Sequence, residues 1–174
     1  MCRALFIDRD GVINKEKEYL YKIEDFEFID GVVEALLMAQ KAGFKLIVIT
    51  NQSGIGRGYY NNDDFKKLTT WMQHTLYSEG VKIDDVLHCP HTPDNACSCR
   101  KPHPGLIHSA AKKHQIDLSN SFLVGDKESD IKTAINTHLK ASVLVRCGHK
   151  IDESKTKATF VEDDLLNAVK KLLN

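Results

Sequence analysis

The sequence lacks any long hydrophobic run. No stretch reaches the roughly eighteen apolar residues of a membrane-spanning helix, and the N-terminal residues do not form a secretory signal peptide. We therefore expect a cytoplasmic protein with no membrane partner. The chain also lacks net charge, because Lys plus Arg and Asp plus Glu each number 24. With no excess of positive charge, a nucleic-acid partner is not expected.

Internal repeats, low-complexity tracts and Pro/Gly/Ser-rich linkers are absent as well. A chain of 174 residues can bury about 70% of the surface that its unfolded form exposes, so one core suffices. We therefore predict a single domain over residues 1–174 and a monomeric chain.

Short β-rich apolar runs alternate with amphipathic stretches along the whole chain. The predicted strands cover residues 4–8, 45–50, 86–89, 122–125 and 142–145. The predicted helices cover residues 32–42, 63–78, 104–114, 129–136 and 163–173. Most of the strands are continuously apolar, as strands buried on both faces are. The alternation predicts an α/β fold with a central parallel sheet and helices on both faces.

The most polar segments follow the predicted strands directly. In parallel sheets, ligands bind at the carboxyl ends of the strands, where the connecting loops gather. Four such loops carry charged, amide or thiol groups: residues 8–10, 50–54, 89 onward and 125–130. Because all four loops are expected at one edge of the sheet, they favour an active site over a set of unrelated polar surface loops.

Asp8 and Asp10 end the first of these strands. Side chains at positions i and i+2 of a strand point the same way, so the two carboxylates are directed at one place. Neighbouring carboxylates repel each other unless a divalent cation or a shared proton compensates. The spacing alone is equally consistent with a solvated turn, because Asp and Gly are common turn residues.

The loop at residues 50–54 (TNQSG) offers a hydroxyl, two amides and a flexible backbone. Successive backbone N–H groups of such a turn can hold phosphate oxygens. Ordinary turn formation explains the same residues. Arg100 and Lys101 are adjacent cations before a predicted helix, and they suit either a phosphate site or a solvated surface.

Asp126 follows another predicted strand, so its carboxylate is expected at the same edge of the sheet as those of Asp8 and Asp10. Together with Asp8 and Asp10 it could surround a hard cation such as Mg²⁺. We expect Asp130 to hold Lys127 or a backbone amide instead. Among the histidines outside metal-binding motifs, only His88 and His103 are expected near this site.

Three of the five cysteines lie within residues 89–99. In a reducing compartment, such a cluster indicates metal binding more than disulfides. Three thiols and one imidazole form a complete tetrahedral set for a structural zinc ion. The predicted zinc ligands are Cys89, His91, Cys97 and Cys99.

Four motifs in order, at residues 8–14 (DRDGVIN), 50–54 (TNQSG), 99–102 (CRKP) and 124–130 (VGDKESD), resemble those of haloacid-dehalogenase (HAD) superfamily phosphatases. The similarity runs over roughly residues 4 to 150 and extends to the cysteine loop. It implies a Rossmann-like three-layer sandwich with a zinc-bound loop. Only about twenty residues separate Asp10 from the helix near residue 32, too few for a separate cap domain. A capless fold is therefore expected.

The resemblance implies a role for each residue at the strand ends. Asp8 would attack phosphorus, and Asp10 would protonate the leaving oxygen and then activate water. Mg²⁺ would be held by Asp8, the Asp10 carbonyl and Asp126, with the Lys127 backbone as a further ligand. Thr50 would contact the phosphoryl group. Phosphate binding is also implied for Asn51 and Lys101, and sugar recognition for Glu16, Lys17, Glu18, Tyr19, Gln52, Ser53 and Arg100.

The implied substrate is a small sugar bisphosphate, most closely a heptose bisphosphate, of either anomer. Histidinol phosphate is the alternative within the superfamily; Asn14 and Arg57 favour the sugar. A polynucleotide 3′-phosphatase would need a basic track, which the balanced charge does not suggest. A zinc-stabilised binding module without activity is the remaining alternative. Relatives with the sugar motifs usually carry Gly where this chain has Glu18, so that Glu18 is expected to be strained or its loop to differ.

Overall fold

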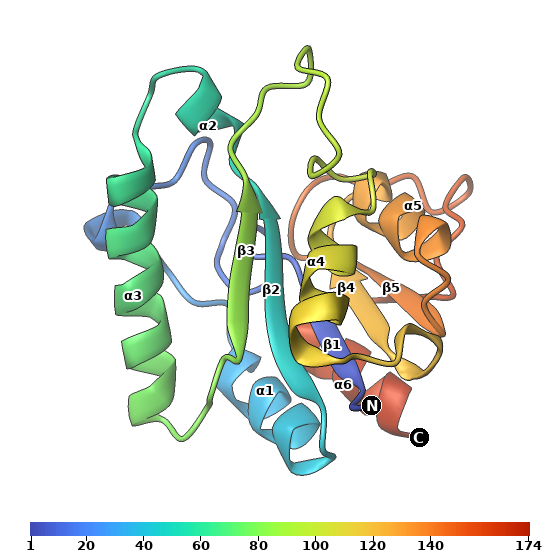
Figure 1. Cartoon of the computed structure of the whole chain (residues 1–174). Coiled ribbons are helices and arrows are strands. Elements are labelled where there is room, and N and C mark those ends of the chain that lie inside the picture. Colours follow the sequence, from blue (N-terminus) through green and yellow to red (C-terminus); the bar gives the residue numbers. More distant parts are fainter.

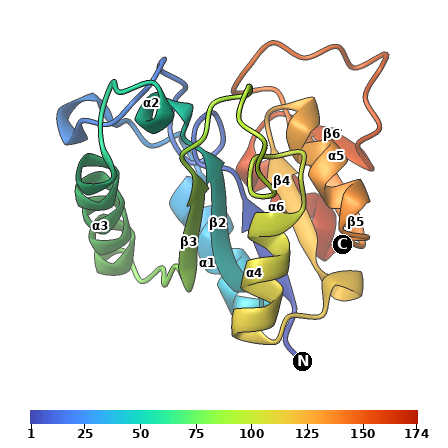
Figure 2. The same cartoon turned by 45° about the horizontal axis from the view of Figure 1, so that its top comes forward.

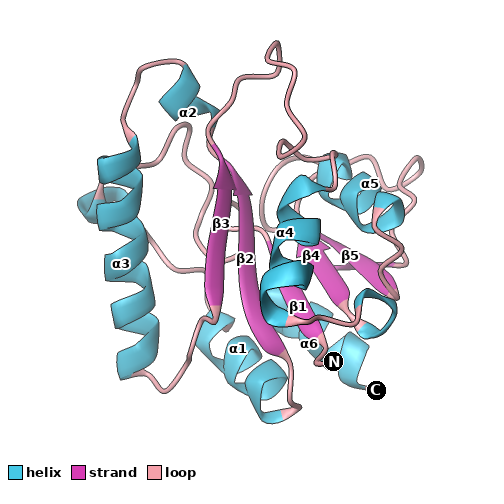
Figure 3. Cartoon of the chain, in the orientation of Figure 1, coloured by secondary structure: helices cyan, strands magenta, loops and turns pink.

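One parallel six-stranded sheet forms the centre of the molecule (Figures 1 and 3). The computed structural model describes residues 1–174. The strand order across the sheet is β3-β2-β1-β4-β5-β6, and every neighbouring pair is parallel. The strands are β1 (Ala4–Ile7), β2 (Lys45–Asn51), β3 (Asp85–Cys89), β4 (Phe122–Gly125), β5 (Ala141–Val145) and β6 (Phe160–Glu162).

Helices cover both faces of the sheet and complete three layers (Figure 2). The core on one face contains side chains of α1 (Val32–Lys41), α3 (Asn62–Ser78) and α6 (Leu165–Leu173). The core on the other face contains side chains of α4 (Gly105–His114) and α5 (Glu128–Asn136). The short α2 (Ser53–Gly56) follows β2, and two 3-10 turns, η1 (Ile23–Asp25) and η2 (Leu118–Asn120), lie in connections.

The central strand β1 shows why its sequence is apolar throughout. Leu5 and Ile7 belong to the core beneath α1, α3 and α6, whereas Ala4 and Phe6 belong to the core beneath α4 and α5. Alternate side chains of a strand point to opposite faces, and here both faces are covered. The chain therefore reaches Asp8 from a strand that is rigidly packed on both sides.

A capping box sets the start of α3. The Asn61 side chain accepts a hydrogen bond from the Asp64 backbone N–H at 2.9 Å, and the Asp64 carboxylate accepts one from the Asn61 N–H at 2.9 Å. These bonds satisfy two backbone donors that a helix start leaves free. They also fix the end of the connection from α2, which carries Tyr60.

The predicted α/β architecture is confirmed, with element ends shifted by one or two residues. Four short elements were not predicted: α2, the edge strand β6 and the 3-10 turns η1 and η2. The segment between Asp10 and α1 contains only loops, isolated bridges and η1, so the fold has no cap, as expected. No helix combines the length and apolar character needed to cross a membrane.

Candidate active site

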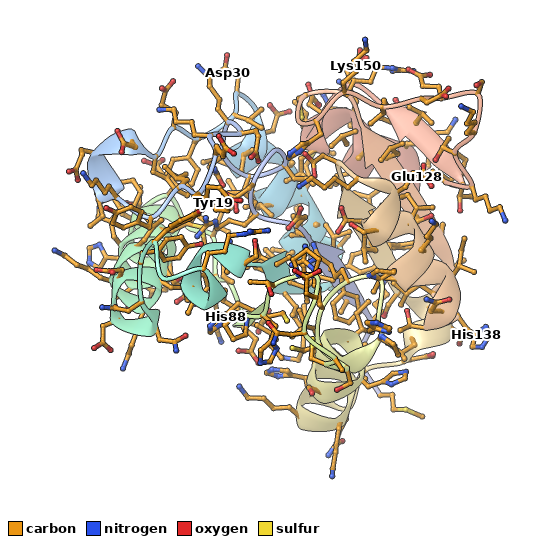
Figure 4. The ribbon with its side chains drawn as sticks, turned by 90° about the horizontal axis from the view of Figure 1, so that it is seen from above. Tyr19, Asp30, His88, Glu128, His138 and Lys150 are labelled. Carbon is orange, nitrogen blue, oxygen red and sulfur yellow. The ribbon has the colours of Figure 1, made fainter.

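A cavity of about 330 Å³ opens at the carboxyl ends of the central strands. Its lining includes all twelve residues predicted for catalysis, phosphate binding and sugar recognition. These are Asp8, Asp10, Glu16, Lys17, Glu18, Tyr19, Thr50, Asn51, Gln52, Ser53, Arg100 and Lys101. Figure 4 looks down on this edge and shows Tyr19 close to α2, whereas His138 lies at the periphery. The structure thus brings together residues from separate loops, as the strand-end argument predicts.

Asp8 and Lys101 form a buried ion pair at the cavity floor. Lys101 Nζ lies 2.9 Å from Asp8 Oδ1 and 2.6 Å from Asp130 Oδ1, and it donates to the Ile49 carbonyl at 3.0 Å. Burial raises the pKa of Asp8 to about 6, although the charge of Lys101 opposes the shift. Burial disfavours the charged form of Lys101 too, but Asp130 and Asp8 outweigh it and raise its pKa. Lys101 is therefore a fixed cation beside Asp8.

Asp10 is held on several sides at once. Its Oδ1 accepts from Arg9 Nη2 at 2.9 Å and from Asn14 Nδ2 at 3.0 Å, and its Oδ2 accepts from Gln52 Nε2 at 2.9 Å. Arg9 is itself almost fully buried and donates to the Leu20 carbonyl at 3.0 Å. The carboxylate of Asp10 thus has a defined orientation, and its side-chain partners differ from that of Asp8, which is Lys101.

Asp126 suits a cation ligand because one of its oxygens has no partner. Oδ1 is buried and makes no hydrogen bond, a costly situation for a carboxylate oxygen unless a ligand satisfies it. Carboxylate oxygens of Asp8, Asp126 and Asp130 lie within 4.8 Å of one another. Burial, and then the charge of Asp8, raises the pKa of Asp126. Such a set of hard oxygen donors fits Mg²⁺.

Asp130 has two partners. Its Oδ2 accepts from the Lys127 backbone N–H at 3.1 Å, as expected, and its Oδ1 pairs with Lys101. The sequence did not suggest the second contact, since Lys101 and Asp130 lie far apart along the chain.

His149 is the principal site residue that the sequence did not reveal. Its Nδ1 lies 2.6 Å from Asp126 Oδ2, its backbone N–H donates to the same oxygen at 2.9 Å, and its Nε2 lies 3.7 Å from Glu16 Oε1. Burial, and then the charge of Asp10, raises the pKa of Glu16 to about 7. His149 lies in the loop that follows β5, which the strand-end argument places at the edge of the site, but the sequence spacing does not single out this residue.

Neither His88 nor His103, the two histidines expected near the site, lines the cavity. The His88 ring packs on Phe65 with a centroid distance of 4.0 Å, and its Nε2 lies 3.1 Å from Asn62 Oδ1. β3 ends one residue later, and the pleat turns His88 toward α3.

The loop that contains Glu16 to Tyr19 differs from the expectation at Glu18. The left-handed backbone falls on Tyr19, with φ of 53°, and not on Glu18. The Tyr19 ring packs edge-on against Tyr59 with centroids 4.8 Å apart, and Arg57 lies over its face. These contacts offset the cost of a conformation that non-glycine residues rarely adopt.

Besides Lys101 and Gln52, three further side chains predicted to bind the ligand are engaged within the protein. The Asn51 amide pairs with the backbone of Lys101 in both directions, at 3.0 and 3.2 Å. Lys17 Nζ lies 2.9 Å from Glu27 Oε1, and Arg100 Nη1 donates to the His91 carbonyl at 3.2 Å. The Asn51 side chain therefore holds the backbone of Lys101 in position.

The predicted zinc ligands form a compact cluster beside this cavity. His91 Nδ1 lies 3.5 Å from Cys89 Sγ and 3.3 Å from Cys99 Sγ, and the Cys89 and Cys97 sulfurs are 3.7 Å apart. Zn–S bonds of about 2.3 Å in a tetrahedron place sulfurs about 3.8 Å apart, which the Cys89 and Cys97 sulfurs match, whereas the Cys89 and Cys99 sulfurs lie closer together, at 2.7 Å. No disulfide joins the cysteines, so the donor set fits a zinc ion.

Comparison with known proteins identifies relatives with the same architecture. A family model described as HAD-hydrolase-like matches residues 98–171. The chain is 50% identical over 144 residues to D-glycero-beta-D-manno-heptose-1,7-bisphosphate 7-phosphatase of Helicobacter pylori, covering 82% of this chain and 83% of that protein. The chain belongs to the heptose-1,7-bisphosphate 7-phosphatase family of HAD-like phosphatases.

The relatives that resemble the chain include enzymes named for the beta anomer of the substrate and enzymes named for the alpha anomer. The chain is 45% identical over 163 residues to the D-glycero-alpha-D-manno enzyme of Photorhabdus laumondii, covering 90% of this chain and 89% of that protein. The D,D-heptose 1,7-bisphosphate phosphatase of B. bronchiseptica, solved with magnesium and phosphate, superimposes with a TM-score of 0.86 at 29% identity and covers 98% of both chains. Family membership therefore leaves the anomer open.

Proposed function

We propose that the chain is a Mg²⁺-dependent phosphatase that removes the C7 phosphate of D-glycero-D-manno-heptose 1,7-bisphosphate, in the synthesis of nucleotide-activated heptose. The observation that carries the proposal is the pair of carboxylates after β1. Asp8 is buried beside a fixed cation, and Asp10 is held by donors on other loops. The identity of the proposed substrate is inferred from the family to which the chain belongs.

The two carboxylates suit different steps of phosphoryl transfer. Asp8 attacks phosphorus and the bond to the sugar oxygen breaks, while Asp10, protonated in the substrate complex, gives that oxygen its proton and becomes a carboxylate. Asp10 then removes a proton from the water that hydrolyses the aspartyl-phosphate, a role that typically contributes about 10²–10⁴-fold. Lys101 lies where it can balance charge on the phosphoryl oxygens.

The residues that would hold Mg²⁺ are Asp8, Asp126 and the backbone carbonyl of Asp10, with the Lys127 backbone as a further ligand. The unpartnered oxygen of Asp126 supports this assignment. Mg²⁺ in this place neutralises negative charge on the phosphoryl group.

We further propose that Cys89, His91, Cys97 and Cys99 bind a structural zinc ion. Four donors leave no position for a reacting water. The cluster orders a polar loop, and its carbonyl at His91 holds Arg100, which lines the cavity. Free thiols that form no disulfide also support a reducing, cytoplasmic location.

A monomeric, single-domain enzyme is part of the proposal. The two cores share one sheet, which supports a single domain. Light scattering coupled to size-exclusion chromatography measures the oligomeric state.

The deciding experiment is phosphate release from the α and β heptose 1,7-bisphosphates beside histidinol phosphate, with Mg²⁺ supplied. We expect a higher kcat/KM for at least one heptose bisphosphate than for histidinol phosphate. A preference for histidinol phosphate would contradict the proposed substrate. Absence of turnover across a broad panel of phosphate esters would instead favour a non-catalytic binding module.

A further inference from the structure

Tyr60 lies outside the motifs of the family resemblance, yet its hydroxyl contacts a residue of the site. It is 7% exposed, lies in the connection between α2 and α3, and lines the cavity. The hydroxyl donates a hydrogen bond to Gln52 Oε1. Burial raises the pKa of Tyr60 to about 12, so the hydroxyl keeps its proton at neutral pH.

The Tyr60 ring is fixed in place by its neighbours. It stacks on Tyr21 with centroids 5.1 Å apart and an interplanar angle of 10°. Its edge fills the space over Gly54, where a Cβ atom would lie 2.2 Å from Tyr60 Cε1. The hydroxyl therefore has little freedom to leave Gln52.

Gln52 occupies the centre of the network and uses both ends of its amide. Its Nε2 lies 2.9 Å from Asp10 Oδ2 and 2.8 Å from Thr50 Oγ1, so both amide hydrogens have partners. An amide has one donor end and one acceptor end, and an ionised carboxylate can only accept. The nitrogen must face Asp10, and the oxygen that remains is the one that Tyr60 satisfies.

The direction of these bonds determines what Thr50 can do. Its oxygen accepts from Gln52, and the hydroxyl makes no hydrogen bond to another protein group. Its single hydrogen is therefore available to a ligand in the cavity, which Thr50 lines. A phosphoryl oxygen is an acceptor of the required kind.

We propose that Tyr60 is a positioning residue that orients the Gln52 amide, and through it aligns the Asp10 carboxylate and directs the Thr50 hydroxyl toward the phosphoryl group. This inference deepens the proposed phosphatase function and rests on it. Without the Tyr60 hydroxyl, Gln52 Oε1 becomes a buried acceptor with no donor. The amide is then free to turn or tilt, and both contacts that depend on its nitrogen weaken.

The variant Tyr60→Phe tests the inference by removing one oxygen and keeping the ring. We expect kcat for the heptose bisphosphate to fall about 10-fold, because misplacing a catalytic group by a fraction of an ångström carries such a cost. We also expect inorganic phosphate, with Mg²⁺ present, to bind several-fold more weakly by calorimetry. Thermal melting establishes that the variant is folded.

The matched control is Tyr21→Phe, which removes the hydroxyl of the stacked partner. That hydroxyl makes no hydrogen bond within the protein, so kcat and phosphate binding should stay within about twofold of wild type. A further variant, Gln52→Ala, should remove the effect of Tyr60→Phe, because residues that act through one another are not additive. Additive losses in the double variant would contradict the coupling.

Two outcomes would overturn the role of Tyr60. The first is unchanged kcat and phosphate binding in Tyr60→Phe. The second is a higher KM for the sugar substrate with kcat and phosphate binding unchanged, which would show that the hydroxyl touches the sugar. If the wild type releases no phosphate from the bisphosphate, the proposed substrate fails, while phosphate binding by the two proteins still tests Tyr60.

Discussion

Two polar clusters at the same edge of the sheet are built in opposite ways. The cysteine–histidine cluster takes all four donors from residues 89–99. The acidic cluster takes Asp8 from the loop after β1 and Asp126 and Asp130 from the segment that joins β4 to the start of α5, and it depends on Lys101 from a third segment. Donors close in sequence are readily gathered by one loop, whereas the acidic cluster exists only once the whole sheet is assembled.

The two clusters also differ in their expected roles: the cysteine–histidine cluster stabilises the fold, and the acidic cluster takes part in the reaction. With the proposed zinc ion bound, the thiol cluster would have four protein ligands and no open position. The acidic cluster leaves an oxygen of Asp126 without a partner and a carboxylate of Asp8 with a raised pKa. Ionisable groups with perturbed pKa values in or directly beneath a cavity are typical of active sites.

The largest effect expected is that of Asp8→Asn. The amide keeps the shape of the side chain but cannot attack phosphorus, so kcat should fall by at least about 10⁴-fold. Lys101 keeps Asp130 as its partner, and zinc content should not change. Phosphate release and metal analysis measure the two effects.

Asp85→Asn is the matched control for this change. Asp85 is the first residue of β3 and therefore lies at the amino ends of the strands, away from the cavity. There its carboxylate pairs with Lys113 at 2.8 Å. That variant should keep wild-type turnover. Full activity in Asp8→Asn would contradict the assignment of the acidic cluster as the reacting site.

Loss of zinc should act mainly on stability. At free zinc about 1,000 times Kd, binding contributes about 4 kcal/mol to the free energy of unfolding, and Cys99→Ser should lose most of it. Denaturant unfolding and one bound zinc per chain are the measurements. Cys2→Ser, a thiol outside the cluster, should keep both values. A purified chain without zinc would refute the assignment.

Sequence spacing predicted the acidic pair and the thiol cluster because each is local. It also predicted the main strands, since strands buried on both faces are continuously apolar. It missed β6, three half-buried residues with no apolar run, and α2, a single turn with two glycines. It missed His149 because the meaning of that residue lies in a contact with Asp126 that only the folded sheet creates.

The raised pKa of Asp8 predicts a pH dependence in magnesium-free buffer. Between its ordinary pKa of 3.8 and about 6, the folded protein keeps a proton that the unfolded chain has lost. The contribution of Asp8 to stability therefore falls as pH rises through this window, by on the order of 3 kcal/mol, and then levels off. Urea unfolding of wild type and Asp8→Asn from pH 4 to 7.5 measures it. A difference between the two that does not change with pH would contradict the assignment.

The smallest effect concerns His149 and tests whether the acidic cluster needs a residue that sequence spacing cannot reveal. His149→Ala removes the ring donor from Asp126 Oδ2 and keeps the backbone one, so Mg²⁺ binding should weaken about 10–100-fold. His149→Asn can place a side-chain nitrogen near the Nδ1 position and should restore affinity, whereas His149→Gln cannot. Calorimetry with Mg²⁺ measures binding independently of turnover. Equal affinities in all three variants would mean that Asp126 is positioned by its backbone contacts and burial alone.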